Sequence, residues 1–163
     1  MLDDVLGMIT KDMTTEVRKE LSERVAKAGN APRELARRMA FDEIEVAAPV
    51  LRSSKALTQE DLVEIVSSRT QAHIQAVTTR PDISESVSEA IVDHGDDTAF
   101  ASLLKNESAA ISRSSFEKVA VRAQTSPALH EPVVKRKSMP LDLLNDMYFV
   151  VEKELRASIL ETN

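Results

Sequence analysis

The sequence predicts an all-α protein, an α-solenoid or HEAT-like array of about five antiparallel helix pairs. The first reason is a short segment that recurs four times, in which a capping residue follows an apolar anchor and a second apolar residue follows within the next turn. Its anchors lie 26, 28 and 28 residues apart (57 to 83, 83 to 111 and 111 to 139), at Leu57, Ile83, Ile111 and Met139. A fixed period of this length is typical of stacked helical repeats.

The second reason is composition. Aromatic residues make up only 3% of the 163 residues, and no convincing alternation of apolar and polar residues indicates a strand. The chain is 42% hydrophobic and 29% charged, which is typical of a folded domain. It has no Cys, so disulfides, thiol chemistry and Cys-based zinc sites are excluded.

The first predicted pair spans the N-terminal quarter of the chain. A helix over 13–28 has an apolar residue at every fourth position, at Met13, Val17, Leu21 and Val25. Gly29 ends this helix, and Pro32 opens the next one. The inward face of that second helix carries Leu35, Ala36 and Met39.

The later pairs follow the repeat. A helix over 43–52 precedes one that begins at Thr58, where Thr58 and Asp61 form a predicted capping box. The remaining helix starts are predicted at Ser84, at Asp96 or Asp97, at Ser112, at Ser126 with Pro127, and at Pro140. Pro49 and Pro132 fall inside first helices, where a proline bends the helix. The last helix is expected to continue to Ile159, with Leu155 and Ile159 still apolar.

Several of these segments resemble the bacterial domain-of-unknown-function family 2336, known mainly from alphaproteobacteria. The resemblance covers roughly residues 13–155 and is carried by 31–42, 46–54, 57–62, 73–80, Asn106, Ile111 with Ser112, and 136–140. It implies an all-helical, HEAT-like array and brings no established catalytic residues.

Charge and targeting signals narrow the class of protein. The net charge is -6, which argues against nucleic-acid binding because phosphate contacts need a basic face. The first residues are acidic where a secretory signal is basic, and no apolar run is long enough to span a membrane. We therefore expect a cytoplasmic protein with one domain over 1–163. Because no terminal capping repeat is evident, we expect this domain to be part of a longer protein or to pair with another copy.

No pattern of catalytic residues emerges. His73, His94 and His130 are not spaced for one helical metal site, and the three glycines form no phosphate-binding loop. A site built from His94 with Asp93, Asp96 and Asp97 is the alternative to a solvated acidic loop. We expect no enzyme activity, metal or cofactor.

Basic residues near the ends of first helices form a predicted basic rim along one edge of the array. The rim consists of Arg52, Arg80, Lys105, Lys135, Arg136 and Lys137. Such an edge could hold a carboxylate, a phosphate or an acidic partner. The alternative is that each cation interacts with the carbonyl groups at the end of its own helix. Arg33 and Arg37, which share a helix face, form a second basic patch with Arg38.

These observations favour a noncatalytic module for protein–protein interaction or a regulatory adaptor. The alternative function is a small-ligand or nucleotide sensor that uses the basic rim or a groove between repeats. The last helix carries five large apolar residues in a row over 147–151, so a homodimer through this helix is a further alternative.

Overall fold

The computed structural model describes the backbone of residues 2–161 and the side chains of residues 5, 7–150, 152 and 153. This part of the chain contains eleven α-helices, one short 3-10 helix and no strand, so the all-α prediction is confirmed. The elements are α1 (Leu2–Lys11), α2 (Thr15–Lys27), α3 (Arg33–Ala40), α4 (Ile44–Ser53), α5 (Gln59–Ser68), α6 (Gln71–Thr78), α7 (Glu85–His94), α8 (Asp97–Lys105), α9 (Arg113–Ala123), η1 (Pro127–Leu129), α10 (His130–Lys135) and α11 (Leu141–Glu161).

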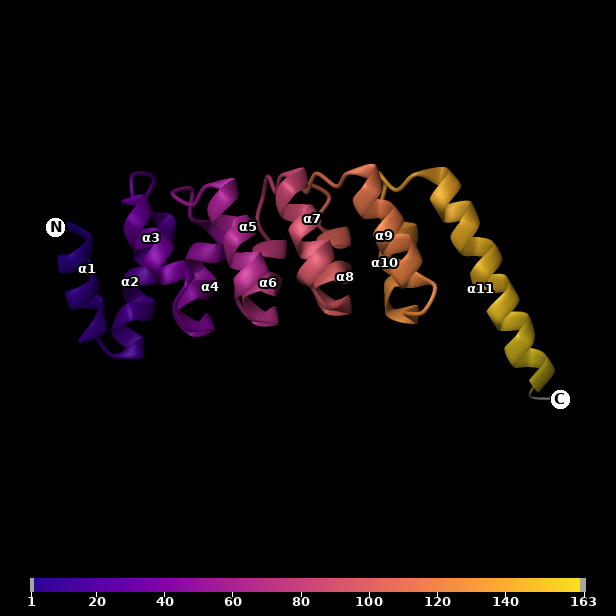
Figure 1. Cartoon of the computed structure of the whole chain (residues 1–163), viewed down its shortest axis with the longest axis horizontal. Coiled ribbons are helices and arrows are strands. Elements are labelled where there is room, and N and C mark those ends of the chain that lie inside the picture. Colours follow the sequence, from indigo (N-terminus) through magenta and orange to yellow (C-terminus); the bar gives the residue numbers. More distant parts are fainter. Residues whose placement is uncertain (1, 162–163) are drawn as a thin grey trace.

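The helices lie in a row that runs from α1 at one end to α11 at the other (Figure 1). Even-numbered helices pack on one another in chain order, α2 on α4, α4 on α6, α6 on α8, and α8 on α10. Odd-numbered helices form a second series, in which α5 packs on α7, α7 on α9, and α9 on α11. The buried apolar side chains form one cluster that extends from Val25 to Met147. No helix of the described residues is long and apolar enough to cross a membrane.

The predicted helix starts are confirmed at Thr58, Ser84 and Ser112, whose side chains accept a backbone amide of the first turn. At Thr58 the capping box is complete, since Oγ1 accepts from the Asp61 amide at 3.2 Å and Asp61 Oδ2 accepts from the Thr58 amide at 3.0 Å. Of the two acids considered for α8, Asp96 is the cap. These contacts satisfy amides that have no partner inside the helix.

Two elements differ from the prediction. The helix expected from Ser126 begins instead as the 3-10 turn η1 and becomes α-helical at His130. Pro132 has no amide to donate to the carbonyl four residues earlier, which weakens the first α-helical turn at this point. The predicted apolar positions Leu155 and Ile159 lie outside the described side chains, although the backbone of α11 is helical to Glu161.

Helix α1 is a further difference, because the sequence pattern did not predict it. Its Gly7 disfavours a helix by about 1 kcal/mol relative to Ala. The structure shows what this glycine permits: a Cβ atom at Gly7 would lie 2.8 Å from Nη1 of Arg38. The missing side chain therefore lets the guanidinium of α3 approach the backbone of α1.

Gly95 joins α7 to α8 in a space that has no room for a side chain. A Cβ atom there would lie 2.6 Å from the Ile91 carbonyl oxygen and 3.0 Å from Cβ of Ala99. We expect Gly95→Ala to lower the free energy of unfolding by about 1–3 kcal/mol, the usual cost of overpacking. Gly29→Ala is the matched control, because a Cβ at Gly29 meets no atom within 4 Å. Urea unfolding followed by circular dichroism measures both, and equal stabilities would contradict this account.

Candidate functional site

The basic rim predicted from the sequence divides into exposed and buried members. Arg52, Lys105 and Lys135 lie in the last turns of α4, α8 and α10, and all three are exposed. Arg80 and Arg136 are only 8% and 4% exposed. The rim that faces solvent is therefore shorter than predicted.

The buried guanidinium of Arg80 reaches the C-terminal end of α4. Its Nη1 donates to the carbonyl oxygens of Val50 at 3.2 Å and Leu51 at 2.7 Å, and its Nη2 donates to that of Ser54 at 2.7 Å. These carbonyls lie at the C-terminal end of α4, where internal donors run out, although the Val50 carbonyl also accepts from the Ser54 amide at 3.0 Å. Burial lowers the pKa of Arg80, yet a guanidinium of this kind stays charged in proteins.

Arg136 makes the same contact with the C-terminal end of α8. Its Nη1 donates to the carbonyl oxygens of Leu104 at 3.3 Å and Asn106 at 2.5 Å, and its Nη2 donates to that of Ala109 at 2.6 Å. Burial lowers the pKa of this guanidinium too. Both arginines thus cap a helix of the preceding pair and not their own, which corrects the simpler alternative considered from the sequence.

Asn106 takes the intermediate position between these two arginines. Its Nδ2 donates to the carbonyl oxygens of Thr78 at 2.8 Å and Arg80 at 2.7 Å, at the C-terminal end of α6. Arg80, Asn106 and Arg136 therefore form what we call the capping ladder. Each member follows the end of an even-numbered helix and satisfies the end of the even-numbered helix before it.

The exposed rim lysines meet in one groove between α8 and α10. Lys105 and Lys135 line this groove, whose volume is about 340 Å³, together with Glu107 and Glu131. The Glu131 carboxylate pairs with Lys135, and the two lysines lower its pKa, Lys135 more than Lys105. Arg52 lines a comparable groove of about 390 Å³ between α2 and α4.

The second basic patch of the sequence proves to be an ion-pair cluster between α3 and α5. Arg33 donates to the Asp61 carboxylate from Nε at 3.0 Å and from Nη2 at 2.8 Å, and Arg37 donates to it from Nη1 at 2.7 Å. Asp61 is only 1% exposed. The Arg33 contact is the main cause that holds the pKa of Asp61 well below its usual range, and the Thr58 amide and Arg37 add to it.

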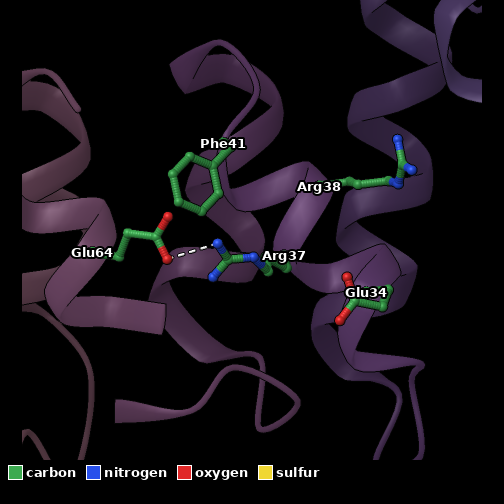
Figure 2. Close-up of a pocket in the computed structure, with 5 residues that line it drawn as sticks. All are labelled: Glu34, Arg37, Arg38, Phe41 and Glu64. Carbon is green, nitrogen blue, oxygen red and sulfur yellow. Dashed lines mark hydrogen bonds and ion pairs between the residues drawn. The ribbon is translucent and has the colours of Figure 1, made fainter. Parts of the chain in front are cut away.

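Figure 2 shows the outer part of this α3–α5 cluster. Arg37 extends toward Glu64, which accepts a hydrogen bond from its Nη2 at 2.6 Å, and the guanidinium lies 5.0 Å from the centroid of the Phe41 ring. A cavity of about 380 Å³ opens beside these side chains, with Glu34 and Arg38 completing its lining. The guanidiniums of Arg33 and Arg37 are therefore already engaged by carboxylates of the next pair.

The acidic residues considered for a metal site have other partners. Asp93 accepts from Nζ of Lys118 at 2.6 Å, and Asp97 accepts from Nε of Arg122 at 2.8 Å. Asp96 caps α8. Among the residues that the structure describes, no group of three His, Cys, Asp or Glu side chains could hold a metal ion.

The three histidines lie on different helices and do not converge. His73 is 2% exposed, with Nε2 2.8 Å from the Asp42 carbonyl oxygen and Nδ1 2.7 Å from Oγ1 of Thr70. Because a carbonyl oxygen only accepts, Nε2 carries a proton and donates it there. His130 contacts the Ala123 carbonyl oxygen, and His94 is exposed at the end of α7.

The C-terminal end of the row presents apolar side chains to solvent. Leu141, Tyr148 and Phe149 of α11 are 81%, 65% and 59% exposed, whereas Met147 between them is buried. A groove of about 270 Å³, lined almost entirely by apolar atoms, lies between α10 and α11. Its lining consists of His130, Val134, Leu144, Met147 and Tyr148.

Comparison with known families agrees with the resemblance seen in the sequence. Residues 46–163 match a family described as an uncharacterised protein conserved in bacteria (DUF2336), and the chain belongs to this family. The match begins later than the resemblance suggested, so the segment 31–42 lies outside it, and it continues to the last residue. No curated protein and no solved structure matches the chain.

Proposed function

We propose that the chain is a noncatalytic protein-interaction module built on an α-solenoid of about five HEAT-like helix pairs. The packing of even-numbered helices in one series and odd-numbered helices in another supports this architecture. The capping ladder supports it further, because each of its members joins consecutive pairs through the same kind of contact. A rigid row of this kind offers an extended surface to a partner.

The observation that carries the proposal is the pair of lysines in the groove between α8 and α10. Arg136 already donates to the Leu104 and Asn106 carbonyl oxygens at the end of α8, and the Lys105 side chain is exposed beside them. Lys105 and Lys135 come from consecutive pairs, yet they line one groove and both act on the carboxylate of Glu131. We infer that a partner protein places its own carboxylates along this edge, where Arg52 adds a further exposed base.

Reversing the charge of these lysines is expected to remove the partner. We expect a chain with Lys105→Glu and Lys135→Glu to recover at least about fivefold less of the bound proteins than the wild type, because each lost contact becomes a repulsion. Affinity capture from the native cell with quantitative mass spectrometry measures this recovery. The matched control changes the exposed Lys27 and Lys55 to Glu, which gives the same net charge. Recovery of the same proteins by both variants would contradict the proposal.

A small-ligand sensor is the second candidate function. The groove between α8 and α10 has the volume of a small-molecule site, and two lysines and two glutamates line it. Thermal unfolding in the presence of nucleotides or carboxylic acids separates the two candidates. A rise in melting temperature that depends on Lys105 and Lys135 would favour the sensor.

A further inference from the structure

The outer face of α11 carries a regular stripe of exposed side chains. Asp142, Asp146, Phe149 and Lys153 follow one another at intervals of four, three and four residues, and all four are exposed. This interval keeps residues on one side of a helix, as in the seam between two paired helices. Met147, on the opposite side of the helix, is buried and lines the groove between α10 and α11. We call these four residues the outer stripe.

The outer stripe lies at the end of the row, where α11 slants away from the other helices (Figure 1). Helix α11 has 21 residues and is therefore about 31 Å long, whereas no other helix exceeds 13 residues. Tyr148 and Phe149 meet edge to face, with ring centroids 5.9 Å apart. The chain has only five aromatic residues, one Tyr and four Phe, so two of them stand on this exposed helix. Exposed aromatic groups of this kind are typical of interfaces.

The order of charges along the outer stripe is complementary to its own reverse. The acids Asp142 and Asp146 precede Phe149, and the base Lys153 follows it. When two copies of α11 lie antiparallel and cross at Phe149, Asp146 of each copy, three residues before Phe149, comes close to Lys153 of the other, four residues after it. Asp142, seven residues before Phe149, already pairs with Arg113 of its own chain, so the complementary charges of the stripe are Asp146 and Lys153. Parallel pairing would instead set Asp146 against Asp146.

We propose that α11 is a homodimer interface, in which the outer stripe of one chain packs antiparallel on the outer stripe of a second copy. A twofold interface requires one surface to be complementary to itself, and the stripe meets this requirement. Phe149 lies at the centre of the interface and contacts Phe149 of the second copy. Two Asp146–Lys153 ion pairs, related by the twofold axis, flank the aromatic centre and fix the antiparallel direction. This interface is separate from the lysine groove proposed to bind a partner protein.

Charge exchange tests the proposal on the full chain. We expect Asp146→Lys to raise the dimer dissociation constant at least about tenfold. The interface then contains two repulsive contacts, in each of which the new lysine of one copy meets Lys153 of the other. Lys153→Asp is expected to have a similar effect. The variant with both changes restores opposite charges across the interface and should return the constant to within about threefold of the wild type. Sedimentation velocity over a wide concentration range measures all four proteins.

The restoration is specific to pairing between copies. Asp146 and Lys153 are two helical turns apart in one chain, too far to form an ion pair with each other. Both are exposed, so the variants are expected to fold, which far-ultraviolet circular dichroism checks. A wild type that stays monomeric at every concentration would overturn the proposal, and so would a double variant as weak as the single ones.

Phe149→Ser and Met8→Ser distinguish the twofold dimer from a head-to-tail contact between the two ends of the row. Met8 of α1 is 72% exposed at the other end of the row, where a head-to-tail contact would place it. Loss of self-association in Phe149→Ser alone supports the twofold dimer. Loss in Met8→Ser with retention in Phe149→Ser would overturn it. The variant with Lys105→Glu and Lys135→Glu should dimerise like the wild type, because the lysine groove is separate from the outer stripe. The dimer proposal can therefore hold even if the partner-binding proposal fails.

Discussion

Replacing Arg80 by Met is expected to lower the free energy of unfolding by about 3 kcal/mol. The guanidinium donates to three carbonyl oxygens at the end of α4, and the side chain is 8% exposed. A hydrogen bond from a charged donor contributes about 1.5–3 kcal/mol, and a buried acceptor left without a donor costs about 1–3 kcal/mol. Methionine fills much of the same space, so the loss reports mainly on the missing donors. Urea unfolding at pH 7 measures the change.

Two comparisons identify the cause of this loss. Arg52→Met removes an exposed base from the end of the same helix and should change the free energy of unfolding by no more than about 0.5 kcal/mol. The loss of unfolding free energy in Arg80→Lys should lie between those of Arg52→Met and Arg80→Met. An ammonium group keeps the charge but lacks the planar fork that reaches two sides of the helix end. A loss below about 1 kcal/mol in Arg80→Met would show that water replaces the guanidinium without cost.

The pattern along the chain predicted those features that depend on near neighbours. The caps at Thr58, Ser84 and Ser112 were found because the side chain and the amide it accepts are three residues apart. The apolar anchors of the repeat were found because their spacing is regular, and Leu57, Ile83 and Met139 are all buried. The all-α fold follows from these local signals.

Contacts between consecutive pairs cannot be predicted from near neighbours in the sequence alone. In the sequence, Arg52 and Arg80 are both bases near the end of a first helix. Arg80 is buried because it contacts residues 26 to 30 positions earlier, at the end of α4, whereas Arg52 is exposed. The difference in position is small but decisive, since Arg52 lies inside the last turn of α4 and Arg80 lies beyond the end of α6. A polar residue one or two positions after the helix end, at Arg80, Asn106 and Arg136, is the available signal.

The α3–α5 cluster was missed for the same reason. The sequence pattern indicates Arg33 and Arg37 only as a basic patch, and Asp61 only as part of a capping box. The 28 residues between Arg33 and Asp61 equal one period of the repeat, which places the two side chains on α3 and α5, the second helices of consecutive pairs. Charges of opposite sign one period apart therefore indicate contacts between pairs. This signal is present in the sequence, but it can be interpreted only when the order in which the helix pairs stack is known.

Asp61→Asn is expected to lower the free energy of unfolding by about 3 kcal/mol at pH 7. The buried carboxylate accepts from Arg33, Arg37 and the Thr58 amide, and removing one partner of a buried ion pair costs about 3–5 kcal/mol. We place the loss at the lower end because both guanidiniums reach solvent and can hydrate. Glu64→Gln is the control. It removes the exposed carboxylate that Arg37 contacts and should cost less than about 1 kcal/mol.

The same substitution should change how stability depends on pH. The pKa of Asp61 is lowered in the folded chain, so below the pKa of the unfolded chain, about 3.9, the unfolded state binds a proton that the folded state does not. The stabilisation by this carboxylate is therefore complete above about pH 5 and is lost progressively as the pH falls below 4. Other carboxylates with lowered pKa, such as Asp97 and Asp142, titrate in both proteins and cancel in the difference. The difference in unfolding free energy between the wild type and Asp61→Asn should thus become smaller between pH 5 and pH 2. Urea unfolding at each pH measures this difference. A difference that stays constant would show that Asp61 is not held as a carboxylate by Arg33 and Arg37.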